Sequence, residues 1–276
     1  MSDTSIFSNH LTLRDGIYYS QEQSVISYPE DQNELCMQFE ESSFWFIHRN
    51  DCIAEMIKRF PPSGAFLDIG GGNGFVAKRI QDEGFETIVL EPGPVGASNS
   101  KKRGVEQVIC STFQDAHFPP QSIDAAGMFD VIEHIEDDDA MLREIHASLK
   151  ENGRLYLSVP AFDWLWSQVD EDAGHFRRYT KTSMKDVLER AGFELEFSTY
   201  IFSVLPLPIF LFRSIPSKLG SKKQHTEIAE TKKKEHTKKA GILDKIWRWE
   251  LNELKKGSRI GFGGTLLIVA RKNGEK

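Results

Sequence analysis

Two histidines are the residues of this sequence best suited to move a proton. His134 follows the end of an apolar run, and His175 lies within residues 162–179, a stretch dense in aromatic, acidic and arginine side chains. An imidazole titrates near neutral pH and can therefore take a proton from a hydroxyl without a metal. We expect His175 to be the general base, with His134 as the second candidate.

A glycine-rich loop is the second feature with chemical meaning. Residues 65–69 form a short apolar run that contains Asp68, and the sequence continues as Gly70-Gly71-Gly72-Asn73-Gly74. Such a run fits a strand covered on both faces, as in parallel sheets. The glycines let the backbone turn sharply and let a ligand lie directly on the main chain. The pattern predicts a nucleotide-like cofactor.

The next strand narrows the choice of cofactor to two classes. Residues 85–90 predict a strand that ends at Glu91, which is placed to accept both hydroxyls of an adenosine ribose. Enzymes that bind dinucleotides such as NAD also carry an acidic residue at this position. Their glycine fingerprint fits this loop poorly, because a frame that begins at Gly70 puts the bulky Phe75 where a small residue is needed.

Two motifs resemble those of a known family. Asp68-x-Gly70-x-Gly72-x-Gly74 resembles motif I of class I S-adenosylmethionine (SAM) dependent methyltransferases. Residues 123–135 resemble the fourth-strand motif of the methyltransferase families labelled type 11, 12 and 23. With strands and helices alternating along residues 60–200, this predicts an α/β fold, a doubly wound Rossmann-like, seven-stranded, mostly parallel sheet with an antiparallel last strand. An N-terminal helical cap and an insertion between the last two strands complete the expected architecture.

The resemblance also implies which residues meet the cofactor, S-adenosyl-L-methionine. They are Asp68, Gly70, Gly72, Asn73 and Gly74 at the methionine end, Glu91 and Pro92 at the ribose, Thr112 and Phe113 near the adenine, and Phe129 and Asp130 at the sulfonium side.

Residues 162–179 resemble the D-E-x-x-G-H-x-R-R-Y stretch of methyltransferases from bacterial glycan and lipid-linked biosynthesis. Residues 40–49 resemble an aromatic–arginine segment that precedes the glycine motif in type 23-like enzymes. These resemblances imply substrate-binding roles for Trp45, Arg49, Asp170, Glu171, Arg178 and Tyr179. The alternatives are ordinary core packing for the aromatic segment and, for the later stretch, an ion-pair cluster that only pins the loop.

The remaining pattern suggests four parts. They are a cap (1–60), a cofactor-binding core (61–202), an insertion (203–262) and the last core strand (263–276). The insertion begins within an apolar run, residues 200–212, that is too short and too proline-interrupted to span a membrane. A lysine-rich stretch, residues 217–239, follows. The apolar run fits a lid, a dimer contact or a membrane-facing surface, and together with the lysines residues 200–240 would suit peripheral contact with an anionic membrane.

Composition limits the class of protein. The net charge of −7 argues against a general nucleic-acid surface. Three scattered cysteines fit a reducing compartment and no structural zinc, and the acidic run 137–139 reads as a helix N-terminus, so no metal is expected. No secretory leader is visible, so we expect a cytoplasmic protein, peripheral to the inner face of the membrane if the insertion binds there. A monomer or a homodimer is expected.

These observations favour a SAM-dependent methyltransferase that acts on a small-molecule or lipid-linked acceptor, at a hydroxyl of a sugar or phenol. Two alternatives stay open. One is an NAD-dependent oxidoreductase, for which a clear Tyr-x-x-x-Lys pair is missing from the sequence. The other is a non-catalytic binding or scaffold protein of the same fold.

Overall fold

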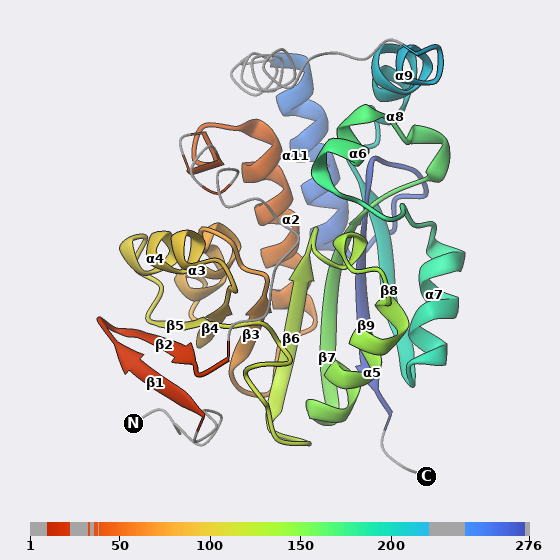
Figure 1. The fold of residues 1–276 in the computed structure, drawn as a ribbon. Helices are drawn as coiled ribbons and strands as arrows, with labels where there is room; N and C mark the ends of the chain where they lie inside the picture. Colours follow the sequence, from red (N-terminus) through yellow and green to blue (C-terminus); the bar gives the residue numbers. More distant parts are fainter. Residues whose placement is uncertain (1–9, 23–32, 34–35, 38, 221–240, 274–276) are drawn as a thin grey trace.

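The computed structural model describes residues 10–22, 33, 36–37, 39–220 and 241–273. Through them runs one sheet in the strand order β1-β2-β5-β4-β3-β6-β7-β9-β8, with helices on both faces (Figure 1). The strands are β1 Leu11–Arg14, β2 Ile17–Ser20, β3 Phe66–Ile69, β4 Thr87–Leu90, β5 Gln107–Cys110, β6 Ile123–Phe129, β7 Leu149–Pro160, β8 Phe193–Ile201 and β9 Thr265–Lys272. The longer helices are α2 Phe44–Arg59, α3 Phe75–Asp82, α4 Pro94–Lys102, α5 Asp138–Ser148, α7 Lys181–Arg190 and α11 Gly241–Lys256.

The predicted fold class is confirmed. Strands β3 to β7 pair in parallel, and β9 runs antiparallel to both β7 and β8. These seven strands are the predicted core. Because strand order reverses beside β3, the loops after β3 and β6 meet at a switch point at the carboxyl edge of the sheet, where ligands bind in such folds.

The sheet has nine strands rather than seven, and the expectation of a purely helical cap was wrong. A hairpin of β1 and β2 joins the edge of the core, where Tyr18 lies opposite Ile109 on the parallel strand β5. The hairpin turns at Asp15 and Gly16, whose φ angles are 50° and 76°. An Asp-Gly pair is a strong hairpin signal because both residues tolerate positive φ, so the sequence did contain this information.

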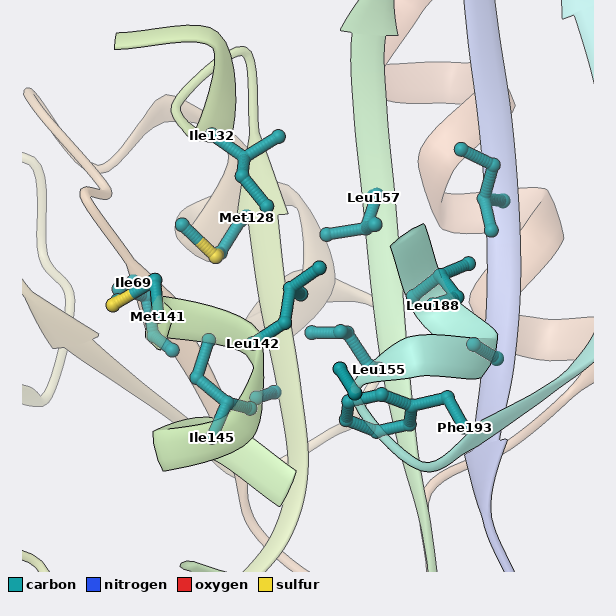
Figure 2. Packing of buried hydrophobic residues seen from close by; sticks show 14 of the residues in the cluster. Ile69, Met128, Ile132, Met141, Leu142, Ile145, Leu155, Leu157, Leu188 and Phe193 are labelled. Carbon is teal, nitrogen blue, oxygen red and sulfur yellow. The ribbon is translucent and has the colours of Figure 1, made fainter. Parts of the chain in front are cut away.

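Alternation along the strands builds two apolar layers. In β6 and β7, Met128, Leu155 and Leu157 belong to a buried cluster with α5 and α7, which Figure 2 shows from close by. The intervening residues, such as Phe129 and Tyr156, join a second buried cluster with α2 and α11 on the opposite face. Because successive side chains of a strand point to opposite faces, the sheet buries apolar residues on both.

The insertion is partly described. Tyr200 and Ile201 of the predicted apolar run belong to β8, and three short helical turns follow: α8 Pro206–Ile209, η4 Phe210–Ser214 and α9 Ile215–Lys218. Most of the lysine-rich stretch lies outside the described residues. Within the ranges the structure describes, no helix is long and apolar enough to cross a membrane. The predicted part boundaries at residues 60, 202 and 262 stay predictions.

Candidate active site

The site lies where parallel strands end at one edge of the sheet. Asp68 is the third residue of β3, Glu91 directly follows β4 and Asp130 directly follows β6. The segment after β7 carries the short helices η3 Asp163–Leu165 and α6 Gln168–Ala173. Four connections that are far apart in sequence therefore meet at this edge.

The glycine loop is held in shape by Glu91. One carboxylate oxygen accepts from the backbone N–H of Gly72 at 2.8 Å, and the other accepts from Gly93 at 2.9 Å. At Gly74, φ is +71°, and a Cβ there would lie 2.7 Å from the Ser100 hydroxyl oxygen. Only glycine suits that position, because positive φ strains other residues and the helix α4 packs too closely. Glu91 thus lies where the resemblance expects it, beside the loop.

Asn73 ties the loop to three other segments. Its amide nitrogen donates to the backbone carbonyl of Asn33 at 2.8 Å and to a carboxylate oxygen of Glu40 at 3.1 Å. Its amide oxygen accepts from Asn99 at 2.9 Å. Asn33 is buried against the loop, with its side-chain oxygen near Gly72. Nothing in the sequence pattern singled out Asn33, since its contact with the loop bridges 40 residues.

Asp68 is a buried carboxylate with spare bonding capacity. It is 1% exposed, and its Oδ2 has no hydrogen-bond partner among the residues that the structure describes. Burial raises the pKa of Asp68 to about 7, with Arg49 opposing the shift and Glu91 adding to it. A buried carboxylate of this kind gains from a nearby ligand cation. The sulfonium and ammonium groups of SAM are such cations, so the residues present fit this cofactor.

Four other predicted cofactor residues have structural contacts of their own. The hydroxyl of Thr112 accepts from the backbone of Asp115 at 3.1 Å. Phe113 is buried in the core, and Phe129 stacks on Phe66 with ring centroids 6.2 Å apart. The carbonyl of Pro92 accepts from the Cys110 thiol. Their contacts with the cofactor stay predictions.

Helix α2 brings Arg49 to this edge. Its guanidinium forms an ion pair with Asp130 and lies 4.8 Å from the ring centroid of Trp45. The second carboxylate oxygen of Asp130 accepts from the Ser158 hydroxyl at 3.0 Å. Trp45 in turn stacks on Phe202 at 5.7 Å, so its ring takes part in packing as well as facing the arginine. Arg49 is thus held by Asp130 and Trp45, and its substrate-binding role stays a prediction.

The loop after β7 is organised around Asp170, which is 1% exposed. Asp170 accepts from two nitrogens of Arg178, at 2.7 and 3.1 Å, and from Nδ1 of His175 at 3.0 Å. It also accepts from the backbone N–H of Ser167 and so caps α6. Burial alone would raise the pKa of Asp170, but the bonds from His175 and Arg178 outweigh it and lower that pKa. The carboxylate is therefore ionised and holds the imidazole in one orientation.

The remaining residues of this stretch serve the loop. Tyr179 donates to Asp138 at 2.8 Å in the protein interior, and Arg177 forms an ion pair with the same carboxylate. Glu171 is exposed on α6. Asp170 and Arg178 therefore form the ion pair of the alternative interpretation, and Arg177 pairs with Asp138 of α5.

The two predicted catalytic histidines meet. Their ring centroids are 4.7 Å apart in an edge-on arrangement, although 40 residues lie between them in the sequence. Burial, and then His175, lower the pKa of His134 to about 4, so its ring is neutral at physiological pH. Beside them, Glu133 is buried, and burial followed by Asp130 raises its pKa well above the usual range. Glu133 had no predicted role, although its position next to His134 was a usable signal.

A nucleotide-binding α/β fold with a glycine loop and a polar centre at the switch point defines a class of cofactor-dependent enzymes. A model of the type 23 methyltransferase domain matches residues 45–196, more than half of the chain. The chain belongs to this methyltransferase family, whose cofactor is S-adenosylmethionine.

Individual relatives are distant. A probable S-adenosylmethionine-dependent methyltransferase of Mycolicibacterium smegmatis is 24% identical over 59% of this chain and 64% of its own length. A ubiquinone biosynthesis O-methyltransferase of Xanthomonas axonopodis is 22% identical over 50% of this chain and 66% of its own. The crystal structure of a SAM-dependent methyltransferase, a possible histamine N-methyltransferase, from Thermotoga maritima aligns with a TM-score of 0.53 at 20% identity and covers 87% of this chain and 99% of that one. The chain spans less than two thirds of the length of the curated relatives it matches.

Proposed function

We propose that this protein transfers a methyl group from S-adenosylmethionine to a hydroxyl oxygen of a small or lipid-linked acceptor, such as a sugar or a phenol. The observation that carries the proposal is the Asp170–His175 pair, in which a buried carboxylate orients a half-buried imidazole at the carboxyl edge of the sheet. Neither alternative needs this pair: the family match supports methyl transfer over hydride transfer, and a scaffold protein gains nothing from an oriented imidazole.

His175 is the proposed proton acceptor. Because ionised Asp170 can only accept, Nδ1 of His175 carries the shared proton and Nε2 keeps a free lone pair. Bound S-adenosylmethionine supplies a methyl group activated on sulfur. As Nε2 takes the acceptor's proton, the oxygen forms the new bond to the methyl carbon, and the electron pair of the breaking carbon–sulfur bond stays on sulfur. His134, neutral and packed against His175, has a positioning role in this scheme.

The acceptor is placed by the residues around this pair. Arg49, fixed by Asp130 and Trp45, contributes a positive charge where the cofactor and acceptor sides meet. Arg178 links two parts of the loop after β7. It pairs with Asp170 and also donates to the carbonyl of Ala161 at 3.1 Å. A hydroxyl acceptor is further supported by the name of one relative, an O-methyltransferase of ubiquinone biosynthesis.

A lipid-linked acceptor is supported by the first part of the insertion. Leu207, Phe212 and Leu219 on its helical turns are 63%, 74% and 80% exposed. Two hydrogen bonds fasten this segment to the acceptor loop. The Ser214 hydroxyl donates to the carbonyl of Leu165 at 2.8 Å, and the Ser217 hydroxyl accepts from the backbone of Gln168 at 3.0 Å. An apolar surface attached to the loop that holds His175 is suited to a membrane-resident acceptor, so peripheral membrane contact belongs to this proposal.

The chemistry is tested with methyl-labelled SAM and matched glycan and phenolic acceptors, each with and without a polyprenyl or acyl anchor. We expect label in an alkali-stable ether, with His175→Ala inactive and the exposed His117→Asn active. Label in an alkali-labile ester or in an amine would contradict the hydroxyl assignment.

Membrane contact is tested by co-sedimentation with anionic vesicles. We expect Phe212→Glu to reduce binding, and Leu13→Glu to leave it unchanged because Leu13, 56% exposed, lies on the distant hairpin. Deleting residues 221–239 measures the contribution of the lysines. Equal sedimentation of all these proteins would argue against membrane contact.

A further inference from the structure

Three side chains at the acceptor side bring metal-ligand atoms together. One carboxylate oxygen of Glu133 and one ring nitrogen each of His134 and His175 all lie within 4.8 Å of one another. Glu133 and His134 sit on the 3-10 turn η2 Ile132–His134 after β6, and His175 follows α6. Both histidines are half-buried, and the carboxylate is buried.

Glu133 supplies an independent sign that something binds there. Its side chain is 1% exposed, and Oε2 has no hydrogen-bond partner within the part of the chain that the structure describes. A buried carboxylate oxygen without a partner is costly, because desolvation is not repaid. The nearest arginines do not offset this desolvation cost with a hydrogen bond. Arg49 is paired with Asp130 and Arg178 with Asp170, and neither donates a hydrogen bond to Oε2 of Glu133.

We propose that Glu133, His134 and His175 bind a divalent first-row transition metal ion such as Zn²⁺ or Mn²⁺. Two imidazoles and one carboxylate are a mixed nitrogen–oxygen set, which suits these ions better than Mg²⁺ or Ca²⁺, both of which prefer all-oxygen sites. Three protein ligands leave a coordination position open. No metal was predicted from the scattered cysteines and the acidic run 137–139, and His175 joins the other two ligands only in the fold.

The surroundings match those of metal-bound histidines. Asp170 accepts a hydrogen bond from the Nδ1–H group of His175. The other ring nitrogen, Nε2, is therefore the one that can bind a metal. Carboxylate–histidine pairs of this kind fix the tautomer and the direction of a ligand ring. The backbone of Ala173 and Gly174 makes hydrogen bonds with His134. Both rings are therefore oriented by groups outside the cluster.

The role of the metal rests on the proposed methyl transfer to a hydroxyl. An acceptor hydroxyl at the open position loses its proton to water, because the nearby dication lowers its pKa. Its oxygen then bonds to the methyl carbon as the carbon–sulfur bond breaks, with that electron pair staying on sulfur. His175 acts in this case through the metal rather than by taking the proton itself.

Metal binding is tested directly on the full chain, stripped with a chelator and titrated calorimetrically with Zn²⁺, Mn²⁺ or Mg²⁺ alone. We expect one equivalent of Zn²⁺ or Mn²⁺ to bind, with Kd weakened by at least about tenfold in Glu133→Gln and in His134→Gln. The exposed Glu136→Gln and His117→Asn are matched controls. Binding of S-adenosylhomocysteine by each variant shows that it is folded, and Co²⁺ absorption bands that change in Glu133→Gln would support ligation by this residue.

The outcomes separate the two proposals. No binding, or binding that Glu133→Gln and His134→Gln leave unchanged while they still bind S-adenosylhomocysteine, overturns the metal site. Full methyl transfer by chelator-treated protein overturns the catalytic role of the metal and leaves the proposed function standing. Stoichiometric, Glu133-dependent binding in a protein that methylates no hydroxyl supports the site and contradicts the proposed function instead.

Discussion

Among the residues that the structure describes, two histidine–carboxylate pairs can be compared, one between α2 and α11 and one at the carboxyl edge of the sheet. In the first, Nε2 of His48 lies 2.9 Å from Glu250, and the two side chains are 5% and 0% exposed. In the second, Nδ1 of His175 lies 3.0 Å from Asp170, with exposures of 16% and 1%. The distances are alike, but the surroundings are not.

The pair between α2 and α11 is completely bonded. Glu250 also accepts from the backbone N–H of Phe202 at 2.8 Å and from both the backbone and the hydroxyl of Ser203. The ring of His48 packs against those of Phe202 and Trp247, which also contact each other. Burial would raise the pKa of Glu250, but these bonds outweigh it and lower that pKa. Such a pair fastens two helices and the end of β8.

At the carboxyl edge, buried carboxylates keep unused bonding capacity. Asp68 and Glu133 each have an oxygen without a partner among the described residues, and the pKa of each is raised. A fold does not gain stability from such groups, so their presence points to ligands. The two regions therefore differ in their buried carboxylates: Glu250 uses both oxygens, whereas Asp68 and Glu133 each keep one oxygen without a hydrogen-bond partner.

The largest effect should follow from removing the edge imidazole. His175→Ala should lower kcat by about 10²- to 10⁴-fold, because the acceptor loses the group that activates its hydroxyl. Affinity for S-adenosylhomocysteine should stay within about twofold, since His175 lies on the acceptor side. Steady-state kinetics and calorimetry measure the two quantities. A kcat near that of the unmodified protein would remove His175 from the chemistry.

Removing the interior carboxylate should instead cost stability. Glu250→Ala should reduce the free energy of unfolding by about 3 to 5 kcal/mol, because it leaves His48 and the donors of Phe202 and Ser203 buried without an acceptor. Urea denaturation measures this change. Glu194→Ala, which breaks an exposed ion pair with Arg271, is the control and should cost less than about 1 kcal/mol. A cost for Glu250→Ala as small as that of the control would erase the contrast between the two pairs.

Glu91 tests the cofactor side of the edge. Glu91→Ala should weaken S-adenosylhomocysteine binding by about 10- to 100-fold, because it removes two hydrogen bonds that shape the glycine loop and the predicted ribose contact. Glu86→Ala, at the exposed start of the same strand segment, is the matched control. Unchanged affinity in Glu91→Ala would mean that the loop keeps its shape without this carboxylate.

Asp68 should make cofactor affinity depend on pH. The pKa of Asp68 in the folded protein, about 7, lies above its value in an unfolded chain, so Asp68 takes up a proton on folding. Binding of the cationic cofactor favours the ionised carboxylate and therefore releases this proton. Affinity for SAM should therefore rise by about tenfold from pH 6 to pH 8 and level off above pH 7. Calorimetry in two buffers counts the released proton. In Asp68→Asn, the dependence of SAM affinity on pH that comes from the protein should disappear. Only the dependence that comes from titration of SAM itself should remain. A profile that the substitution does not change would assign the whole dependence to the ligand.

Elements with local signals could be predicted from the amino-acid sequence alone. The glycine loop, Glu91 after the next strand, and the strand over residues 193–201 follow from contiguous residues, because turns, caps and strand alternation depend on near neighbours. The hairpin at Asp15 and Gly16 was equally local and was overlooked among resemblances that began later in the chain.

Which charged groups form pairs could not be predicted from the sequence and depends on the three-dimensional packing. Arg49 and Asp130 are 81 residues apart, and His48 and Glu250 are 202 apart. His134 and His175 were both predicted, but nothing in their separation showed that they touch or that Glu133 lies beneath them. The physical reason is that each pairing depends on the order in which strands assemble and on the helices that cover them. Whether a buried carboxylate is fully bonded, as Glu250 is, or only partly, as Glu133 is, follows from that packing.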